Sequence, residues 1–123
     1  MTMKTVLIIE NNSDIRENMI ELLELDGYLV LASSNGIEGE QLAKRNHPDI
    51  ILCDIKMGGL TGYQILFDLK HDNGTSNIPI VFVTCCTEKK EINIALKLGV
   101  DGYLCKPFSE DQLLKEIEHC FDK

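Results

Sequence analysis

One aspartate stands where a chemically active carboxylate is expected. Asp54 directly follows the apolar run 50–53, and a glycine-rich turn comes after it. A run that is apolar at every position is typical of a strand buried on both faces, as in a parallel sheet covered by helices. In open α/β sheets, ligands bind at the carboxyl ends of the strands, which is where Asp54 would lie. An aspartate in this place can attack phosphorus and form an acyl phosphate.

Polar groups also stand at the ends of three other predicted strands: Glu10 with Asn11, then Thr84, then Lys106. Each alone is weak evidence, but parallel strands end at one edge of a sheet, so these groups can converge on Asp54. Phosphoryl transfer leaves the protein mainly to position groups and to stabilise charge. Lys106 would pair with a phosphate oxygen, and the Thr84 hydroxyl would donate to another. Mg²⁺, which prefers oxygen ligands, would offset the repulsion between carboxylate and phosphate.

The elements that must position these groups alternate along the chain. Strands are predicted over residues 6–9, 28–32, 50–53, 80–84 and 102–105. Helices are predicted from the polar cluster 10–14 to a cap at Gly27, over about 37–45, from a cap at Thr61 to about 70, over 87–98, and from a capping box at Ser109 and Gln112 to 121. On the helix over 87–98, Ile92, Ala95 and Leu96 are expected to face inward and Ile94 outward.

This alternation predicts an α/β fold: one (βα)5 domain with a parallel sheet, right-handed crossovers and helices on both faces. A chain of 123 residues suits a single domain, expected to span 1–123 with no output domain in this chain. The net charge of −8 disfavours direct nucleic-acid binding. No apolar run approaches the roughly 20 residues of a membrane span, and no secretory signal is present, so we expect a cytoplasmic protein without membrane contact.

The cysteines and histidines do not form a recognisable site. Five cysteines show no C-x-x-C spacing and are expected to be small buried hydrophobes in a reducing compartment. The adjacent Cys85 and Cys86 are the one place where a redox role could begin. The three histidines, at 47, 71 and 119, are scattered and do not look like metal or phospho-accepting groups.

Over essentially its whole length, the chain resembles the response-regulator receiver domains of two-component signalling. The motifs that carry the resemblance are LIIENNSDIREN, PDIILCDIKMGGLTG, PIVFVTCCTE and LGVDGYLCKPF. It implies a flavodoxin-like, doubly wound sheet in the order 2-1-3-4-5. It also implies that Asp54 is the phosphoacceptor, Thr84 the switch hydroxyl, Tyr103 the switch aromatic residue and Lys106 the phosphate-binding lysine. The family usually has a cis bond at the step that is Lys106–Pro107 here.

The resemblance also implies a Mg²⁺ site formed by Glu10, Asn11, Asp54 and the backbone carbonyl of Lys56. The family has an acidic pair after the first strand, and here Asn11 replaces its second member. We therefore expect weaker Mg²⁺ binding and slower metal-dependent phosphorylation. The Lys56 ammonium, pairing with Glu10 or with the phosphate, could partly replace the metal's charge.

Two smaller departures accompany this one. Gly58 stands where proline is usual and should loosen the loop that supplies the carbonyl. Cys85 stands where a small residue such as alanine usually follows the switch threonine, and it is small enough to leave the phosphate room.

The leading interpretation is a phosphorylation-controlled signalling switch. Asp54 would accept a phosphoryl group from a sensor histidine kinase or a phosphotransfer protein. The output partner, which the sequence does not identify, would then bind the face formed by the helix over 87–98, the strand over 102–105 and the last helix. The exposed members expected on this face are Lys89, Lys90, Ile94 and Lys97.

Two other classes of function are weaker candidates. The alternative is a degenerate receiver, a phosphorylation-independent protein-binding module, and Asn11 is its main support. An enzyme acting on an external substrate, or a flavin carrier, is disfavoured because the sequence has no G-x-x-x-x-G-K-[ST] motif. The protein would at most catalyse its own aspartyl phosphorylation and dephosphorylation.

Overall fold

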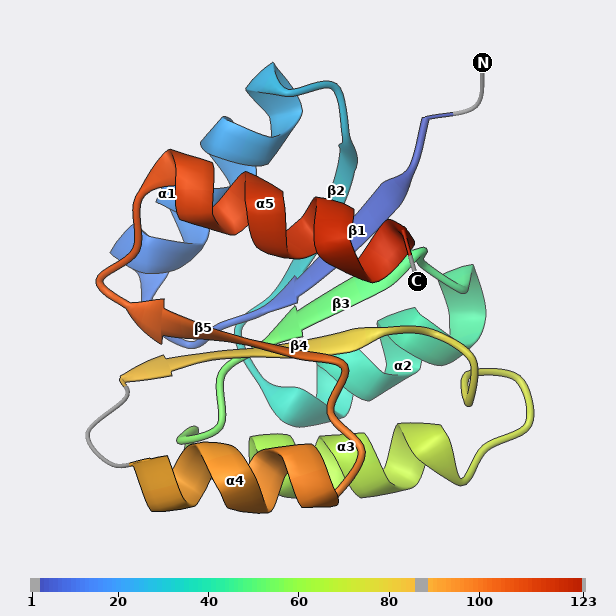
Figure 1. Ribbon diagram of the computed structural model, residues 1–123. Coiled ribbons are helices and arrows are strands. Elements are labelled where there is room, and N and C mark those ends of the chain that lie inside the picture. Colours follow the sequence, from blue (N-terminus) through green and yellow to red (C-terminus); the bar gives the residue numbers. More distant parts are fainter. Residues whose placement is uncertain (1–2, 86–88, 123) are drawn as a thin grey trace.

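The computed structural model describes residues 3–85 and 89–122, in which five strands alternate with five helices (Figure 1). The strands are β1 (Thr5–Ile9), β2 (Leu29–Ser33), β3 (Ile50–Cys53), β4 (Ile80–Cys85) and β5 (Gly102–Lys106). The helices are α1 (Ser13–Leu25), α2 (Gly36–Asn46), α3 (Gly62–Lys70), α4 (Lys89–Lys97) and α5 (Glu110–Phe121).

The strands form one parallel sheet in the order β2-β1-β3-β4-β5, which confirms the predicted topology. Helices α1 and α5 cover one face of the sheet, and α2, α3 and α4 cover the other (Figure 1). None of the described helices is long and apolar enough to cross a membrane.

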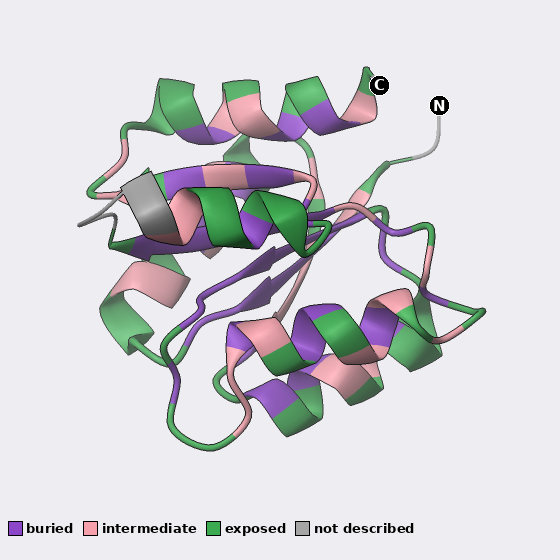
Figure 2. Ribbon diagram, turned by 60° about the horizontal axis from the view of Figure 1, so that its bottom comes forward, coloured by how far each residue is buried: buried purple, intermediate pink, exposed green. Residues whose placement is uncertain are grey.

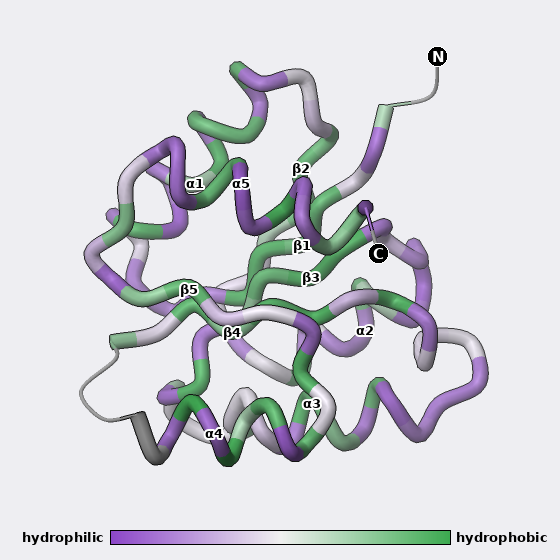
Figure 3. Tube along the Cα trace, viewed as in Figure 1, coloured by the Kyte–Doolittle hydropathy of each residue, from purple (hydrophilic) through white to green (hydrophobic). Residues whose placement is uncertain are grey.

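The central strand β1 shows how the sequence builds a core on both faces. Leu7 and Ile9 pack into the cluster beneath α2, α3 and α4, whereas Val6 and Ile8 pack into the cluster beneath α1 and α5. All four side chains are fully buried. Figure 2 shows buried residues along the central strands and on the inner sides of the helices, and Figure 3 shows the same strands as the most continuous apolar stretches. Buried apolar strands therefore hold the strand ends in fixed register.

The predicted helix caps are present. Thr61 and Gln64 form a capping box at the start of α3, and Ser109 and Gln112 form one at the start of α5. Asn12, from the predicted polar cluster, caps α1 by accepting a hydrogen bond from the Ile15 amide. These contacts fix where three of the helices begin next to the strand ends.

Two expectations, one about helix α4 and one about the ends of two strands, need correction. Leu96 does not face inward but is 51% exposed, because α4 turns Ala95 to the core and the next residue lies about 100° further round the helix. Strands β4 and β5 each extend one residue further than predicted, to Cys85 and Lys106. Residues 86–88, where the helix over 87–98 was expected to begin, lie outside the described part of the chain.

Candidate functional site

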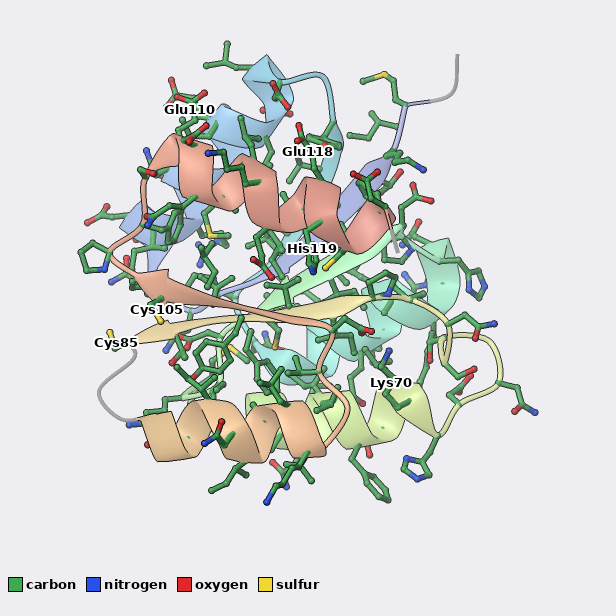
Figure 4. The ribbon with its side chains drawn as sticks, viewed as in Figure 1. Lys70, Cys85, Cys105, Glu110, Glu118 and His119 are labelled. Carbon is green, nitrogen blue, oxygen red and sulfur yellow. The ribbon has the colours of Figure 1, made fainter. Side chains whose placement is uncertain are left out.

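The carboxyl ends of the parallel strands bring the predicted groups to one edge of the sheet. Residue Ile9 of β1 pairs in register with Cys53 of β3, so Glu10 and Asp54 follow side by side. The Asp54 amide donates to the Ile9 carbonyl at 3.0 Å. Figure 4 marks this edge by Cys85 and Cys105 at the ends of β4 and β5, with Lys70 of α3 at the opposite end.

Lys106 lies between the two carboxylates. Its Nζ is 2.5 Å from Glu10 Oε1 and 3.4 Å from Asp54 Oδ2. Glu10 is only 2% exposed and Asp54 only 8%. Burial opposes the charge on Lys106, but the hydrogen bond to Glu10 and the charge of Asp54 outweigh it, so the pKa of Lys106 is raised above its ordinary value. The lysine is therefore a permanent cation at this edge.

Neighbouring groups fix the position of Glu10. Its Oε2 accepts a hydrogen bond from the Asn12 amide at 3.1 Å. Arg16 Nη1 donates to the Glu10 carbonyl oxygen at 2.8 Å and so ties α1 to the end of β1. Sequence reasoning missed Arg16, because an arginine in the first turn of an amphipathic helix reads as a solvated charge.

The backbone around Asp54 is held by close packing. A side chain on Gly62 would place its Cβ 2.7 Å from the Asp54 carbonyl oxygen and 2.7 Å from Ile55 Cα. The start of α3 can therefore approach the chain at Asp54 and Ile55 only because residue 62 is glycine. The Cys53 thiol also donates to the Asp54 carbonyl at 3.2 Å, and burial raises the pKa of Cys53.

The predicted switch residue Tyr103 belongs to an aromatic cluster, and the other switch residue, Thr84, is buried on β4. Thr84 is 3% exposed and pairs in register with Cys105. The ring of Tyr103 meets Phe82 at an interplanar angle of 78°, with centroids 6.5 Å apart. Phe82 in turn packs against Tyr63 of α3 at an interplanar angle of 82°, with ring centroids 5.6 Å apart. Sequence reasoning missed Tyr63 and Phe82, since only the packing of α3 against β4 brings them together.

The Tyr103 hydroxyl is buried within the described part of the chain and has no hydrogen-bond partner there. Burial, followed by the effects of Tyr63 and Glu91, raises the pKa of Tyr103. The phenol is therefore neutral at physiological pH.

The remaining candidates for a metal site lie at the surface of the same edge. The side chains of Asn11 and Lys56 are both exposed. Lys56 takes part in none of the four ion pairs found among the described residues, and the Glu10 carboxylate is bound by Lys106 instead. The expected pairing of Lys56 with Glu10 is therefore not seen, and its pairing with a phosphate stays a prediction.

The donor set fits a hard cation in part. Two adjacent carboxylates, Glu10 and Asp54, suit Mg²⁺, which commonly binds one or two carboxylates together with water. Within the described residues, no three side chains of His, Cys, Asp or Glu gather into a group that could hold a metal. The third oxygen ligand would have to be neutral, from the Asn11 amide or the Lys56 carbonyl.

The cysteines divide into buried and exposed groups. Cys53 and Cys120 are buried, as predicted. Cys85 and Cys105 are exposed, and Cys105 is disulfide-bonded, so the expectation of small buried free cysteines is wrong for both. Cys85 also lines a pocket of about 450 Å³ together with Lys106 and Phe108. Cys86 lies outside the described residues.

Comparison with known proteins agrees with this geometry. The family model of the response regulator receiver domain matches residues 6–118. The chain is 36% identical to protein PilH of Pseudomonas aeruginosa over 115 residues, covering 94% of this chain and 95% of PilH. It is 30% identical to the polar-differentiation response regulator DivK of Brucella ovis, covering 94% of each.

Other relatives are longer, and solved structures share the fold. The chain is 33% identical to the phosphate regulon regulatory protein PhoB of Pseudomonas aeruginosa, of which it covers 52%. The chemotaxis response regulator CheY4 of Vibrio cholerae superposes with a TM-score of 0.91 at 27% identity, covering 97% of this chain and 99% of CheY4. A receiver domain from Clostridium thermocellum superposes with a TM-score of 0.89 at 30% identity, covering 98% of this chain and 95% of that domain.

Receiver domains are signalling domains rather than conventional enzymes, and they generally bind Mg²⁺ at their phosphorylation site. They interact with histidine kinases or phosphotransfer proteins and with output partners. With a matching family model, a sheet in the order 2-1-3-4-5 and relatives matched over nearly their full length, this chain belongs to the response regulator receiver domain family.

Proposed function

We propose that this protein is a phosphorylation-controlled switch that accepts a phosphoryl group on Asp54 from a phosphohistidine of a histidine kinase or phosphotransfer protein. One observation carries the proposal. The Asp54 carboxylate lies at the carboxyl edge of the sheet, 3.4 Å from the Lys106 ammonium. An acceptor and a charge-stabilising cation are thus already together before any phosphate arrives.

The chemistry follows from these contacts. A carboxylate oxygen of Asp54 attacks phosphorus, the bond from phosphorus to the histidine nitrogen breaks, and an acyl phosphate forms. Lys106 then exchanges part of its pairing with Glu10 and Asp54 for a phosphate oxygen, and the Thr84 hydroxyl donates to another. The Lys106 ammonium and the Thr84 hydroxyl position the phosphoryl group and stabilise its charge, which is most of the protein's part in phosphoryl transfer.

A bound Mg²⁺ would supply further neutralisation of charge. Glu10, Asp54, the Asn11 side-chain oxygen and the Lys56 carbonyl would hold it. Asn11 contributes no formal charge, so this site binds the ion more weakly than one with an acidic pair, and metal-dependent phosphorylation is slower.

The output would be read at the face formed by α4, β5 and α5. Phosphorylation adds about −1.5 to −2 charges at Asp54. Thr84 moves toward the phosphate and Tyr103 follows it, which changes a pocket of about 550 Å³ lined by Tyr103, Lys115 and His119 among others. Ile94 and Lys97 are exposed on α4, whereas the side chains of Lys89 and Lys90 are outside the described part of the structure.

A second candidate function is a degenerate receiver that binds its partner without phosphate. The observation that favours it is the exposed Asn11 beside a Glu10 carboxylate already bound by Lys106 and the Asn12 amide. In that case the cluster of Lys106 with two carboxylates would serve only to hold the strand ends together.

Phosphorylation by a small donor separates the two functions. The protein is incubated with acetyl phosphate and Mg²⁺, and with beryllofluoride, with Asp54→Asn as the control. A mass gain of one phosphoryl group and a change in tyrosine fluorescence, both lost in the control, are expected. No mass gain and no spectral change with either reagent would overturn the switch and favour the degenerate module.

A further inference from the structure

Two carboxyl side chains meet between α2 and α3, away from the phosphorylation site. Glu40 of α2 and Asp68 of α3 are within hydrogen-bonding reach of each other. The two helices pack together on the same face of the sheet (Figure 1). Two negative groups at a helix interface repel unless something between them supplies positive charge or a proton.

The atoms at this contact indicate that a proton, rather than a positively charged side chain, relieves the repulsion. Glu40 Oε2 is buried, and with both carboxyls ionised it has no hydrogen-bond donor among the described residues. A buried acceptor without a donor costs free energy. A single proton on either carboxyl removes the repulsion and turns the contact into a hydrogen bond.

Few other charged groups act on Glu40. On its own helix, the ammonium of Lys44 favours the ionised form, and on α3 Asp68 opposes it. From β3, the nearby Cys53 is a neutral thiol. Burial, the hydrogen bond with Asp68 and the charge of Asp68 together raise the pKa of Glu40 to about 7, against the smaller effect of Lys44.

We propose that Glu40 and Asp68 share one proton and form a pH-dependent clamp between α2 and α3. The clamp is closed below neutral pH and opens as rising pH removes the proton. Its position matters for the rest of the molecule because α2 begins at Gly36, where a Cβ would lie 2.9 Å from Leu60 Cβ. Leu60 belongs to the loop between Asp54 and α3, so the clamped helix supports that loop.

The sign of the pH dependence follows from proton linkage. A glutamate whose pKa is raised on folding binds more protons in the folded state than in the unfolded state. Its stabilising contribution is complete below the ordinary glutamate pKa of 4.5 and is lost as the pH rises through about 7. The Glu40→Gln variant has no proton to lose but keeps an amide that can donate to Asp68.

Denaturant unfolding of Glu40→Gln and wild type at a series of pH values tests the clamp. Relative to the variant, the folding constant of the wild type is expected to fall at least about tenfold between pH 5 and pH 8.5, the effect of one unit of pKa difference. A tenfold change is smaller than the change that the whole pKa shift of Glu40 would produce, because Glu40 is partly exposed to solvent. Glu38→Gln, an exposed glutamate on the same helix, is the control and should run parallel to the wild type.

Two measurements guard against a variant that fails to fold. Asp68→Asn should remove the same pH dependence from the other helix. The carboxyl carbon of Glu40 in the wild type, followed by NMR, should titrate near neutral pH. A profile of the wild type parallel to that of both clamp variants, or titration of Glu40 at the ordinary pH of a glutamate, would overturn the proposal.

Discussion

At the scale of single residues, one lysine organises the carboxyl edge of the sheet. Lys106 binds Glu10 and Asp54 although it lies 96 positions from the first and 52 from the second. Removing a partner from a buried ion pair leaves an uncompensated charge, which is costly. The cluster therefore stabilises the strand ends, and under the proposed function a phosphoryl group on Asp54 would compete with two carboxylates for the same ammonium.

Asn11 gives a direct test of how formal charge controls the metal site. Asn11→Asp is expected to tighten Mg²⁺ binding about tenfold, because a hard cation gains a third carboxylate next to Glu10 and Asp54. Titration followed by tyrosine fluorescence, in a chain without tryptophan, measures the affinity.

The matched control for this change is Asn12→Asp. It adds the same charge one residue later, on a side chain whose oxygen caps α1. Equal tightening in both variants would mean that overall charge, rather than a ligand at position 11, sets the affinity.

At the scale of elements, the turn between β3 and α3 decides how Asp54, the proposed phosphoacceptor, is held. The capping box of Thr61 with Gln64 fixes the start of α3, and Gly62 lets that start press against the Asp54 backbone. Gly58, four residues earlier in the same turn, has open space around it. One turn thus contains a glycine that packing requires and a glycine that packing does not.

Gly62→Ala is therefore expected to lower the free energy of unfolding by about 2 kcal/mol, the middle of the range for overpacking, because backbone atoms rather than a flexible side chain stand in the way. Urea denaturation measures the loss, and the amide signals of residues 54 and 55 should shift in NMR spectra. Gly58→Ala should leave both nearly unchanged. Similar losses in the two variants would contradict the packing argument.

At the scale of the whole molecule, a single central sheet joins two cores. Alternate residues of β1 are fully buried in opposite clusters, Leu7 beneath α2 to α4 and Ile8 beneath α1 and α5. A domain of 123 residues with this architecture is expected to unfold in one cooperative step.

Leu7→Ala and Ile8→Ala test this cooperativity from the two sides of the sheet. Each should lower the free energy of unfolding by about 2–5 kcal/mol, the range for truncating a fully buried aliphatic side chain. Far-ultraviolet circular dichroism and tyrosine fluorescence should give coincident urea transitions for both. Separate transitions for the two probes would show that the faces unfold independently.

The amino-acid sequence by itself determined the strands, their order along the chain and the edge of the sheet that carries the polar side chains. Runs such as Ile50–Cys53 are apolar at every position, which only a sheet covered on both faces can bury. The capping boxes at Thr61 and Ser109 are contacts over three residues, so they can be read from spacing alone. Spacing alone could not predict the exact ends of β4 and β5 or the exposure of Leu96. Neighbours that are far away in the sequence determine both.

Only the tertiary structure decided which groups touch. Lys106, and not Lys56, binds Glu10. The ring of Tyr103 contacts Phe82, which contacts Tyr63. Glu40 of α2 lies next to Asp68 of α3. None of these contacts produces a periodic pattern in the sequence. Each depends on how the helices pack on the sheet, which brings together segments that are far apart in the sequence. Charge and hydrogen bonding act over a few ångströms in space, and that proximity is fixed by packing rather than by spacing along the chain.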